Sequence, residues 1–152
     1  MQNLKKIAAL LLALSIMLCA FSLTACNTEE PQSSSGSVTL VVKGAEEKSY
    51  TVSLDGISLD KGLVSIFDAL KAEGKLDYGI TDTFLDYVGD VKNDYEKGEY
   101  VYIYTSVIAD QDVSEYKQTV TYQGTELVSA GVGAIEMTVE DGAIFYVSTI
   151  KW

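Results

Sequence analysis

The helical pattern of this 152-residue chain is concentrated in one stretch, Gly62-Leu63-Val64-Ser65-Ile66-Phe67-Asp68-Ala69-Leu70. Its large apolar side chains recur at the i, i+3, i+4 and i+7 positions, which share one face of a helix: Leu63, Ile66, Phe67 and Leu70, with Val64 widening the stripe. The spacing predicts one amphipathic helix that buries this stripe against the rest of the domain.

Residues around this stretch predict where the helix begins and ends. Asp60, or else Ser58, is placed to cap the free N–H groups of the first turn, and Gly74 can adopt the left-handed conformation that ends a helix. The outer face carries Asp68, Lys71 and Glu73. We expect these three side chains to be solvated.

Outside the helix, the chain from residue 38 onward is β-rich and aromatic. We expect strands at 38–43, 48–55, 84–88, 99–107, 118–123, 126–129, 135–139 and 143–151. The first two strands are predicted to form a hairpin, and Glu140-Asp141-Gly142 is a hairpin turn between the last two. The final strand is apolar on both faces, which favours a central position in a sheet.

The N-terminus has the pattern of an export signal. Lys5 and Lys6 precede an apolar run over 7–21, which is too short to be a stable membrane span. The following Leu23-Thr24-Ala25-Cys26 resembles the lipobox of bacterial lipoproteins. That resemblance implies cleavage before Cys26, a lipid on the Cys26 thiol and an extracytoplasmic protein anchored to the cell membrane.

The chain is therefore expected to have three parts. Residues 1–25 are the signal peptide, 26–37 a flexible polar linker and 38–152 a single folded domain. Removal of the signal takes away two lysines and no acidic residue, so the formal net charge changes from −11 to −13. Such a charge disfavours nucleic acid as a partner.

The residue inventory disfavours an enzyme. The sequence contains no His, which excludes Ser-His and Cys-His nucleophile pairs and common zinc sites. Oxygen ligands gather in one loop, at Asp90, Asn93, Asp94 and Glu96, but without the alternate-residue spacing of a calcium-binding EF-hand loop. We expect no catalytic residues, no metal site and no cofactor apart from the lipid on Cys26.

Four segments resemble the DUF4430 family, also described as the transcobalamin-like C-terminal domain. In chain order they are the helix of 62–70 with Tyr78-Gly79, the 87–95 segment, the aromatic strand 99–104, and Gly131-Val132 followed by 139–146. The resemblance implies an α+β domain, a small β-rich sheet with one main helix packed on it in a β-grasp-like arrangement. It also makes cobalamin a candidate ligand.

The candidate ligand-binding residues are Tyr100, Tyr102 and Tyr104, which alternate along one predicted strand and so share a face. One interpretation packs this tyrosine stripe under the helix. In the other, the helix covers Val101 and Ile103, and the tyrosines face outward, where Tyr87, Tyr95, Tyr122 and Trp152 could extend the surface.

The sequence thus favours a non-enzymatic lipoprotein that binds a small ligand, cobalamin among the candidates, or an envelope protein. The alternative is a structural or adhesive cell-surface module that binds protein or glycan. A concave aromatic pocket would favour the small ligand, and a flat exposed strip would favour protein or glycan.

Overall fold

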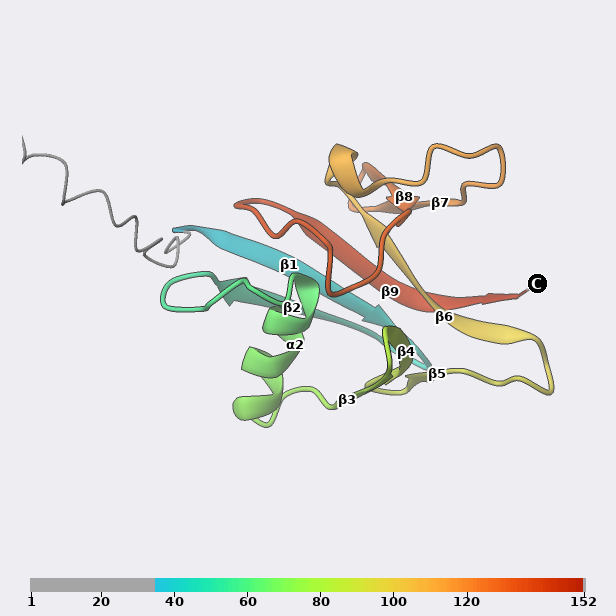
Figure 1. The fold of residues 1–152 in the computed structure, drawn as a ribbon, viewed down its shortest axis with the longest axis horizontal. Helices are drawn as coiled ribbons and strands as arrows, with labels where there is room; N and C mark the ends of the chain where they lie inside the picture. The colour runs from blue at the N-terminus through green and yellow to red at the C-terminus, as the bar shows by residue number, and fades with distance from the viewer. Residues whose placement is uncertain (1–34, 152) are drawn as a thin grey trace, which may run out of the picture. The chain divides into compact units, whose positions relative to one another are not determined.

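The computed structural model describes residues 35–151, so the predicted signal peptide, Cys26 and most of the predicted linker lie outside the described residues. One α-helix, one 3-10 turn and nine strands are found in this range (Figure 1). In chain order they are β1 (Ser37–Lys43), β2 (Glu47–Ser53), α2 (Leu63–Ala72), β3 (Tyr78–Thr81), β4 (Phe84–Val88), β5 (Val91–Lys92), β6 (Glu99–Thr105), η1 (Ile108–Asp110), β7 (Thr119–Tyr122), β8 (Thr125–Ser129) and β9 (Ile144–Lys151). None of the helices in residues 35–151 is long and apolar enough to cross a membrane.

The strands form a mixed six-stranded sheet and a small three-stranded sheet. The order of the larger sheet is β2-β1-β9-β6-β8-β7, with β1 parallel to β9 and the other neighbours antiparallel; the smaller sheet has the order β3-β4-β5. The predicted first hairpin is confirmed as β1 and β2. The predicted central strand is confirmed as β9, which lies between β1 and β6.

Apolar side chains pack on both faces of the larger sheet. On one face, α2 covers a core that includes Leu40, Val42 and Phe145 (Figure 1). On the opposite face a second, smaller cluster contains Val41, Tyr104, Tyr122, Leu127 and Tyr146. Because side chains alternate along a strand, the apolar run of β1 supplies both clusters. The fold is thus a small, β-rich α+β domain.

The amphipathic helix is confirmed, since its predicted apolar stripe is buried. The prediction of its N-terminal cap is wrong. The N-cap is Gly62, without a side-chain cap, whereas Ser58 and Asp60 hydrogen-bond to each other through Ser58 Oγ and Asp60 Oδ1 at 3.1 Å. The predicted C-terminal role of Gly74 is confirmed by its positive φ of 69°.

A distant loop takes the place of the side-chain cap. Leu63 N donates a hydrogen bond of 2.9 Å to the carbonyl oxygen of Ala134, which satisfies one of the free N–H groups of the helix. Gly62 has φ 54° and ψ −134°, and a Cβ there would lie 2.5 Å from the carbonyl oxygen of Ile135. Only glycine fits this backbone and this close approach.

The same loop corrects one predicted strand. Residues 135–139 are not a strand; they belong to the irregular segment between β8 and β9, which buries Ala134 and Met137 in the helix-side core. Glu140-Asp141-Gly142 is a turn, as expected, but it leads from this loop into β9 rather than joining two strands. Sequence reasoning also missed β3, which pairs with β4.

Candidate functional site

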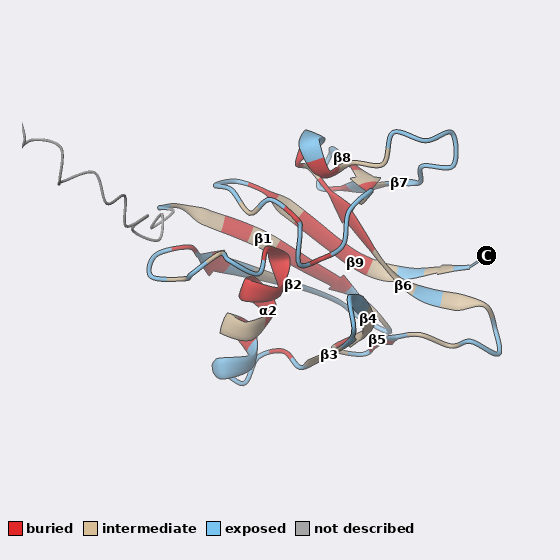
Figure 2. Cartoon of the chain, in the orientation of Figure 1, coloured by how far each residue is buried: buried red, intermediate tan, exposed pale blue. Residues whose placement is uncertain are grey.

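The tyrosine stripe lies on the sheet face opposite α2. Ile103 belongs to the helix-side core, and Val101 packs against it, whereas Tyr104 belongs to the cluster on the opposite face and Tyr102 packs against that cluster. The interpretation that packs the stripe under the helix is therefore wrong. Only the start of β6 is open, however: the strand changes from exposed and intermediate near Glu99 to buried at its end (Figure 2).

The β7–β8 hairpin explains why the stripe is divided. Tyr122 and Leu127 come from this hairpin and pack with Tyr104, which is only 7% exposed. The Tyr104 ring lies 6.3 Å from that of Tyr146 and 5.6 Å from that of Tyr102, edge to face in both pairs. Burial raises the pKa of Tyr104. Tyr104 is thus a core residue, Tyr102 is half-buried and lines a cavity beside Val101 and Ile103, and Tyr100 is the exposed member of the stripe.

Tyr100 lines a cavity of about 440 Å³ between β4, the loop after β5 and the start of β6. We call it the aromatic cavity; it is lined by Thr81, Asp82, Phe84, Leu85, Asp86, Asn93, Tyr95, Tyr100 and Val101. Three of its rings are exposed to solvent: Phe84 at 76%, Tyr95 at 69% and Tyr100 at 36%. Exposed aromatic groups gathered at one concave site are typical of binding sites.

Two of these rings form a corner. The centroids of Tyr95 and Tyr100 are 5.9 Å apart, and the ring planes meet at 72°. Edge-to-face packing favours this arrangement, so each ring limits the movement of the other. The contact between the two rings therefore stabilises the corner.

Asn93 holds the surroundings of this corner in place. Its Nδ2 donates to the carbonyl oxygen of Leu85 at 3.0 Å and to the hydroxyl of Tyr95 at 3.3 Å, and its Oδ1 accepts from Val101 N at 2.7 Å. Both protons of the amide and its oxygen are thereby used. One side chain therefore links β4, β6 and the Tyr95 ring.

The aromatic cavity continues past Phe84. A second cavity, of about 300 Å³, shares Phe84, Leu85 and Val101 with the first and runs along β6 to the 130–134 segment. A third, of about 340 Å³, shares Phe84 with both and reaches Ile135. We call the three together the Phe84 groove, because the ring of Phe84 borders each of them.

The groove is acidic as well as aromatic. Asp82 and Asp86 line its first cavity, and Glu136 lines the third. Asp86 Oδ2 accepts a hydrogen bond of 2.6 Å from Thr81 Oγ1, which fixes that carboxylate at the cavity wall. Asp82 lies in the exposed β3–β4 turn with φ 57°. The described lining residues of all three cavities include no lysine.

A larger cavity, of about 580 Å³, lies near the loop in which the sequence gathers oxygen ligands. Two of its carboxylates have partners: Asp90 accepts from Ala45 N at 3.0 Å, and Asp94 pairs with Lys97 Nζ at 2.5 Å, which lowers the pKa of Asp94. Within residues 35–151 no group of three or more acidic side chains could hold a metal ion. We therefore assign the candidate site to the Phe84 groove.

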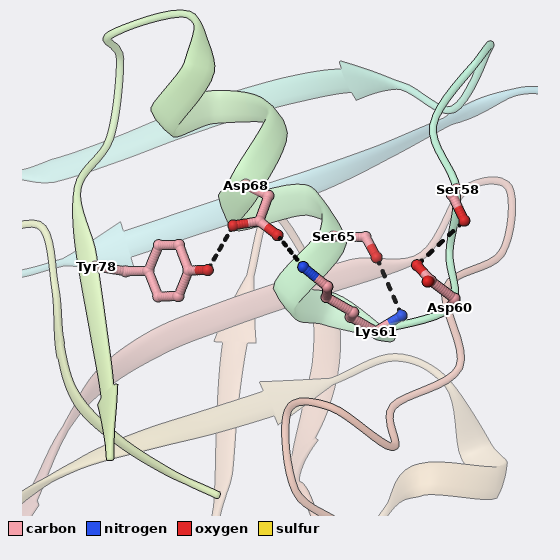
Figure 3. Close-up of polar contacts among 6 residues, drawn as sticks. All are labelled: Ser58, Asp60, Lys61, Ser65, Asp68 and Tyr78. Atoms are coloured by element: carbon pink, nitrogen blue, oxygen red, sulfur yellow. Dashed lines mark hydrogen bonds and ion pairs between the residues drawn. The ribbon is translucent and has the colours of Figure 1, made fainter. Parts of the chain in front are cut away.

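A cluster of polar side chains lies at the start of α2 (Figure 3). Asp68 is its centre: Oδ1 accepts from the Tyr78 hydroxyl at 2.5 Å, and Oδ2 pairs with Lys61 Nζ at 3.1 Å. Ser65 Oγ accepts from the backbone N of Lys61 at 3.3 Å. A Ser-Lys nucleophile pair would require the Lys61 ammonium group to contact the Ser65 hydroxyl. In this structure the ammonium group contacts Asp68 instead.

The titration of this cluster reflects the same contacts. The Tyr78 hydrogen bond, with the Lys61 charge beside it, lowers the pKa of Asp68. Burial, and then the hydrogen bond to Asp68, raises the pKa of Tyr78 to about 12. Tyr78 also packs its ring 5.4 Å from that of Phe67. The cluster therefore joins α2 to β3, and the prediction that Asp68 is merely solvated is incomplete.

Sequence reasoning named two of the exposed rings of the groove, Tyr100 as a site residue and Tyr95 as a possible extension, and missed Phe84. Phe84 opens a short strand with the apolar residues Leu85 and Val88, so its pattern resembles that of a core residue. Its 76% exposure reflects its place at the first residue of β4, where it pairs with Thr81 of β3 and lies beyond the reach of β5, which pairs only with Tyr87 and Val88.

No protein-family model matches the chain, and no curated protein matches its sequence. Among solved structures, the chain is similar to a protein from Ruminococcus gnavus ATCC 29149 described as a "putative metal binding protein". The two are 17% identical in sequence with a TM-score of 0.49, over 77% of this chain and 98% of the other. A likeness at this level assigns no function to the chain.

Proposed function

We propose that this protein is a membrane-anchored, extracytoplasmic lipoprotein whose domain binds a small ligand in the Phe84 groove without catalysing a reaction. One observation carries the proposal: Phe84, Tyr95 and Tyr100 expose their rings around one cavity. Keeping large apolar rings in water forgoes the free energy of burying them. A binding role accounts for that cost.

The size of the site favours a small ligand over a broad protein interface. The aromatic cavity alone, at about 440 Å³, lies within the range of roughly 300–1,000 Å³ usual for small-molecule sites. Asn93 holds the site in place, so little ordering is needed when the ligand enters. The extension toward Val132 and Ile135, 37% and 39% exposed, favours an adhesive module that binds glycan or protein as the second candidate.

The anchor and the family remain part of the proposal. The lipobox at Leu23-Thr24-Ala25-Cys26 supports lipidation of Cys26 and a location outside the cytoplasm. One helix packed on a mixed sheet supports the DUF4430-like, β-grasp-like assignment. That resemblance makes cobalamin the first ligand to test.

The test of the binding site is a ligand screen on the full-length protein in nonionic detergent. Thermal shift and intrinsic fluorescence would be read with cobalamin, cell-wall glycans and common metabolites. We expect a saturable response from at least one compound that is lost in Tyr100→Ala and kept in Tyr116→Ala, an exposed tyrosine outside the groove. A response that both variants keep, or no response at all, would refute ligand binding in the groove.

The anchor is tested by Cys26→Ala, which removes the only thiol on which the lipid can be placed after cleavage. We expect this variant to stay unprocessed or to leave the membrane fraction, and to lose metabolic labelling with a fatty acid. Unchanged processing and labelling would show that the protein is not a lipoprotein of this kind.

A further inference from the structure

The charge around the Phe84 groove indicates what sign of ligand it accepts. Asp82 and Asp86 stand at the wall of the aromatic cavity, Glu136 stands at the far end, and no described lining residue is a lysine. The whole chain adds to this field with a formal net charge of −11. An anion would be repelled here at close range, and a cation would be attracted.

The ring geometry adds a second, independent preference. An aromatic ring has a negative face and a positive edge, and the rings of Tyr95 and Tyr100, whose planes meet at 72°, both line the cavity. A cation carrying alkyl groups gains both from the ring faces and from contact with apolar surface. Phe84 borders the same cavity and can enclose such a group from the β4 side.

We propose that the aromatic cavity of the Phe84 groove binds an organic ammonium ion, a positively charged nitrogen that carries alkyl groups. Tyr95, Tyr100 and Phe84 surround the alkyl groups, and the carboxylates of Asp82 and Asp86 supply the opposite charge. The inference rests on the proposed ligand-binding function and names the chemical class of the ligand.

The alternatives fit these residues less well. A hard metal ion prefers six or more oxygen ligands, or an octahedral set, and residues 35–151 contain no suitable group of acidic side chains. A sugar ring stacks on a flat aromatic platform, and its hydroxyls can donate to carboxylates, but it carries no positive charge to balance theirs. The perpendicular rings and the lysine-free wall therefore favour the ammonium ion.

The test compares choline with 3,3-dimethylbutan-1-ol, which has the same shape but carbon in place of the charged nitrogen. Both are titrated by calorimetry into the full-length protein in nonionic detergent, with a chitin oligosaccharide as a third probe. Cation–π contacts are worth roughly 2- to 30-fold in affinity. We expect choline to bind at least about tenfold more tightly than the neutral analogue, since the carboxylates add to these contacts.

Two substitutions locate the contact. Tyr95→Leu removes one wall of the corner and should weaken choline binding by about fivefold or more. Asp82→Asn removes a charge, and Asn tolerates the positive φ of this position; we expect a loss of about threefold that shrinks as salt is added. The matched controls are Tyr116→Leu and Glu115→Gln, exposed residues outside the groove, which should leave the affinity unchanged.

The outcomes separate this inference from the function on which it rests. Equal binding of choline and its neutral analogue, with loss in Tyr95→Leu, would overturn the ammonium inference and leave an apolar ligand site. Binding of the oligosaccharide alone, lost in Tyr95→Leu, would overturn it in favour of a glycan site. Choline binding that Tyr95→Leu and Asp82→Asn leave unchanged would also overturn the ammonium inference. If none of the three probes binds, the ammonium inference is likewise overturned, and the wider ligand screen then tests whether the groove binds any ligand.

Discussion

Replacing Phe67 by alanine tests whether the predicted stripe of α2 is the centre of the fold. Phe67 is fully buried, and its ring packs 5.4 Å from that of Tyr78 on β3. Truncating a buried Phe to Ala costs about 3–5 kcal/mol, because apolar contacts are lost and a cavity remains. A domain of this size is stable by about 5–15 kcal/mol, so the substitution removes a large share of its stability.

The assay is urea unfolding of a soluble fragment, residues 37–152, followed by circular dichroism. We expect the midpoint to fall with little change in the slope of the unfolding free energy, since the surface exposed on unfolding stays similar. The melting temperature should fall by at least about 10 °C, because a domain of about this length loses several degrees per kcal/mol.

Phe84→Ala is the matched control, because it makes the same chemical change at a residue that is 76% exposed. We expect it to cost under about 1 kcal/mol, as a surface substitution usually does. A loss below about 1 kcal/mol for Phe67→Ala, or equal losses for the two variants, would refute the assignment of the core.

Three further substitutions test contacts that join distant parts of the chain. Tyr78→Phe removes the hydrogen bond to Asp68 and should cost about 1–2 kcal/mol at neutral pH. The folded-state pKa of Tyr78 is raised to about 12, so the contribution of this hydrogen bond is present below pH 10 and is lost toward pH 12. The difference in unfolding free energy between wild type and variant should therefore shrink from pH 10 to pH 12. A constant difference would contradict the assignment. Gly62→Ala should cost about 2 kcal/mol or more in urea unfolding, since φ 54° is strained for alanine and carbonyl groups crowd the new Cβ; an unchanged midpoint would mean that the loop moves freely. Asp110→Ala should cost about 2 kcal/mol, because the buried Asp110 carboxylate accepts hydrogen bonds from Thr138 N at 2.6 Å and Thr138 Oγ1 at 3.1 Å. Hydrogen exchange at the Thr138 amide should also become faster in this variant. Unchanged exchange would show that this contact does not hold the loop.

The parts of the fold that could be predicted are those with a local pattern. The stripe of α2 shows the period of a helix, and β9 shows two apolar faces, so the order of residues suffices to name one element a helix and the other a central strand. The segment 135–139 misled this reasoning. Its buried residue Met137 fills the core from an irregular loop, and burial alone does not make a strand.

The candidate site was predictable only in part, because exposure depends on neighbours distant in sequence. Tyr100, Tyr102 and Tyr104 look equivalent in sequence, yet the β7–β8 hairpin covers Tyr104 and leaves Tyr100 at a cavity. The aromatic cavity also contains Tyr95, from the loop between β5 and β6, and Phe84, from β4. The spacing of these residues along the chain does not predict that their side chains line one cavity.

The sequence by itself determined helix α2, the central strand and the lipobox that predicts an anchored protein, because each depends on the order of neighbouring residues. Tertiary structure alone decided how α2 begins, since its Leu63 N–H bonds to the carbonyl of Ala134 and Gly62 must pass close beneath that loop. It also decided which aromatic rings are open. The physical reason is the same in both cases: burial and hydrogen bonding are satisfied by whichever groups lie nearest in space, however far apart they are in the chain.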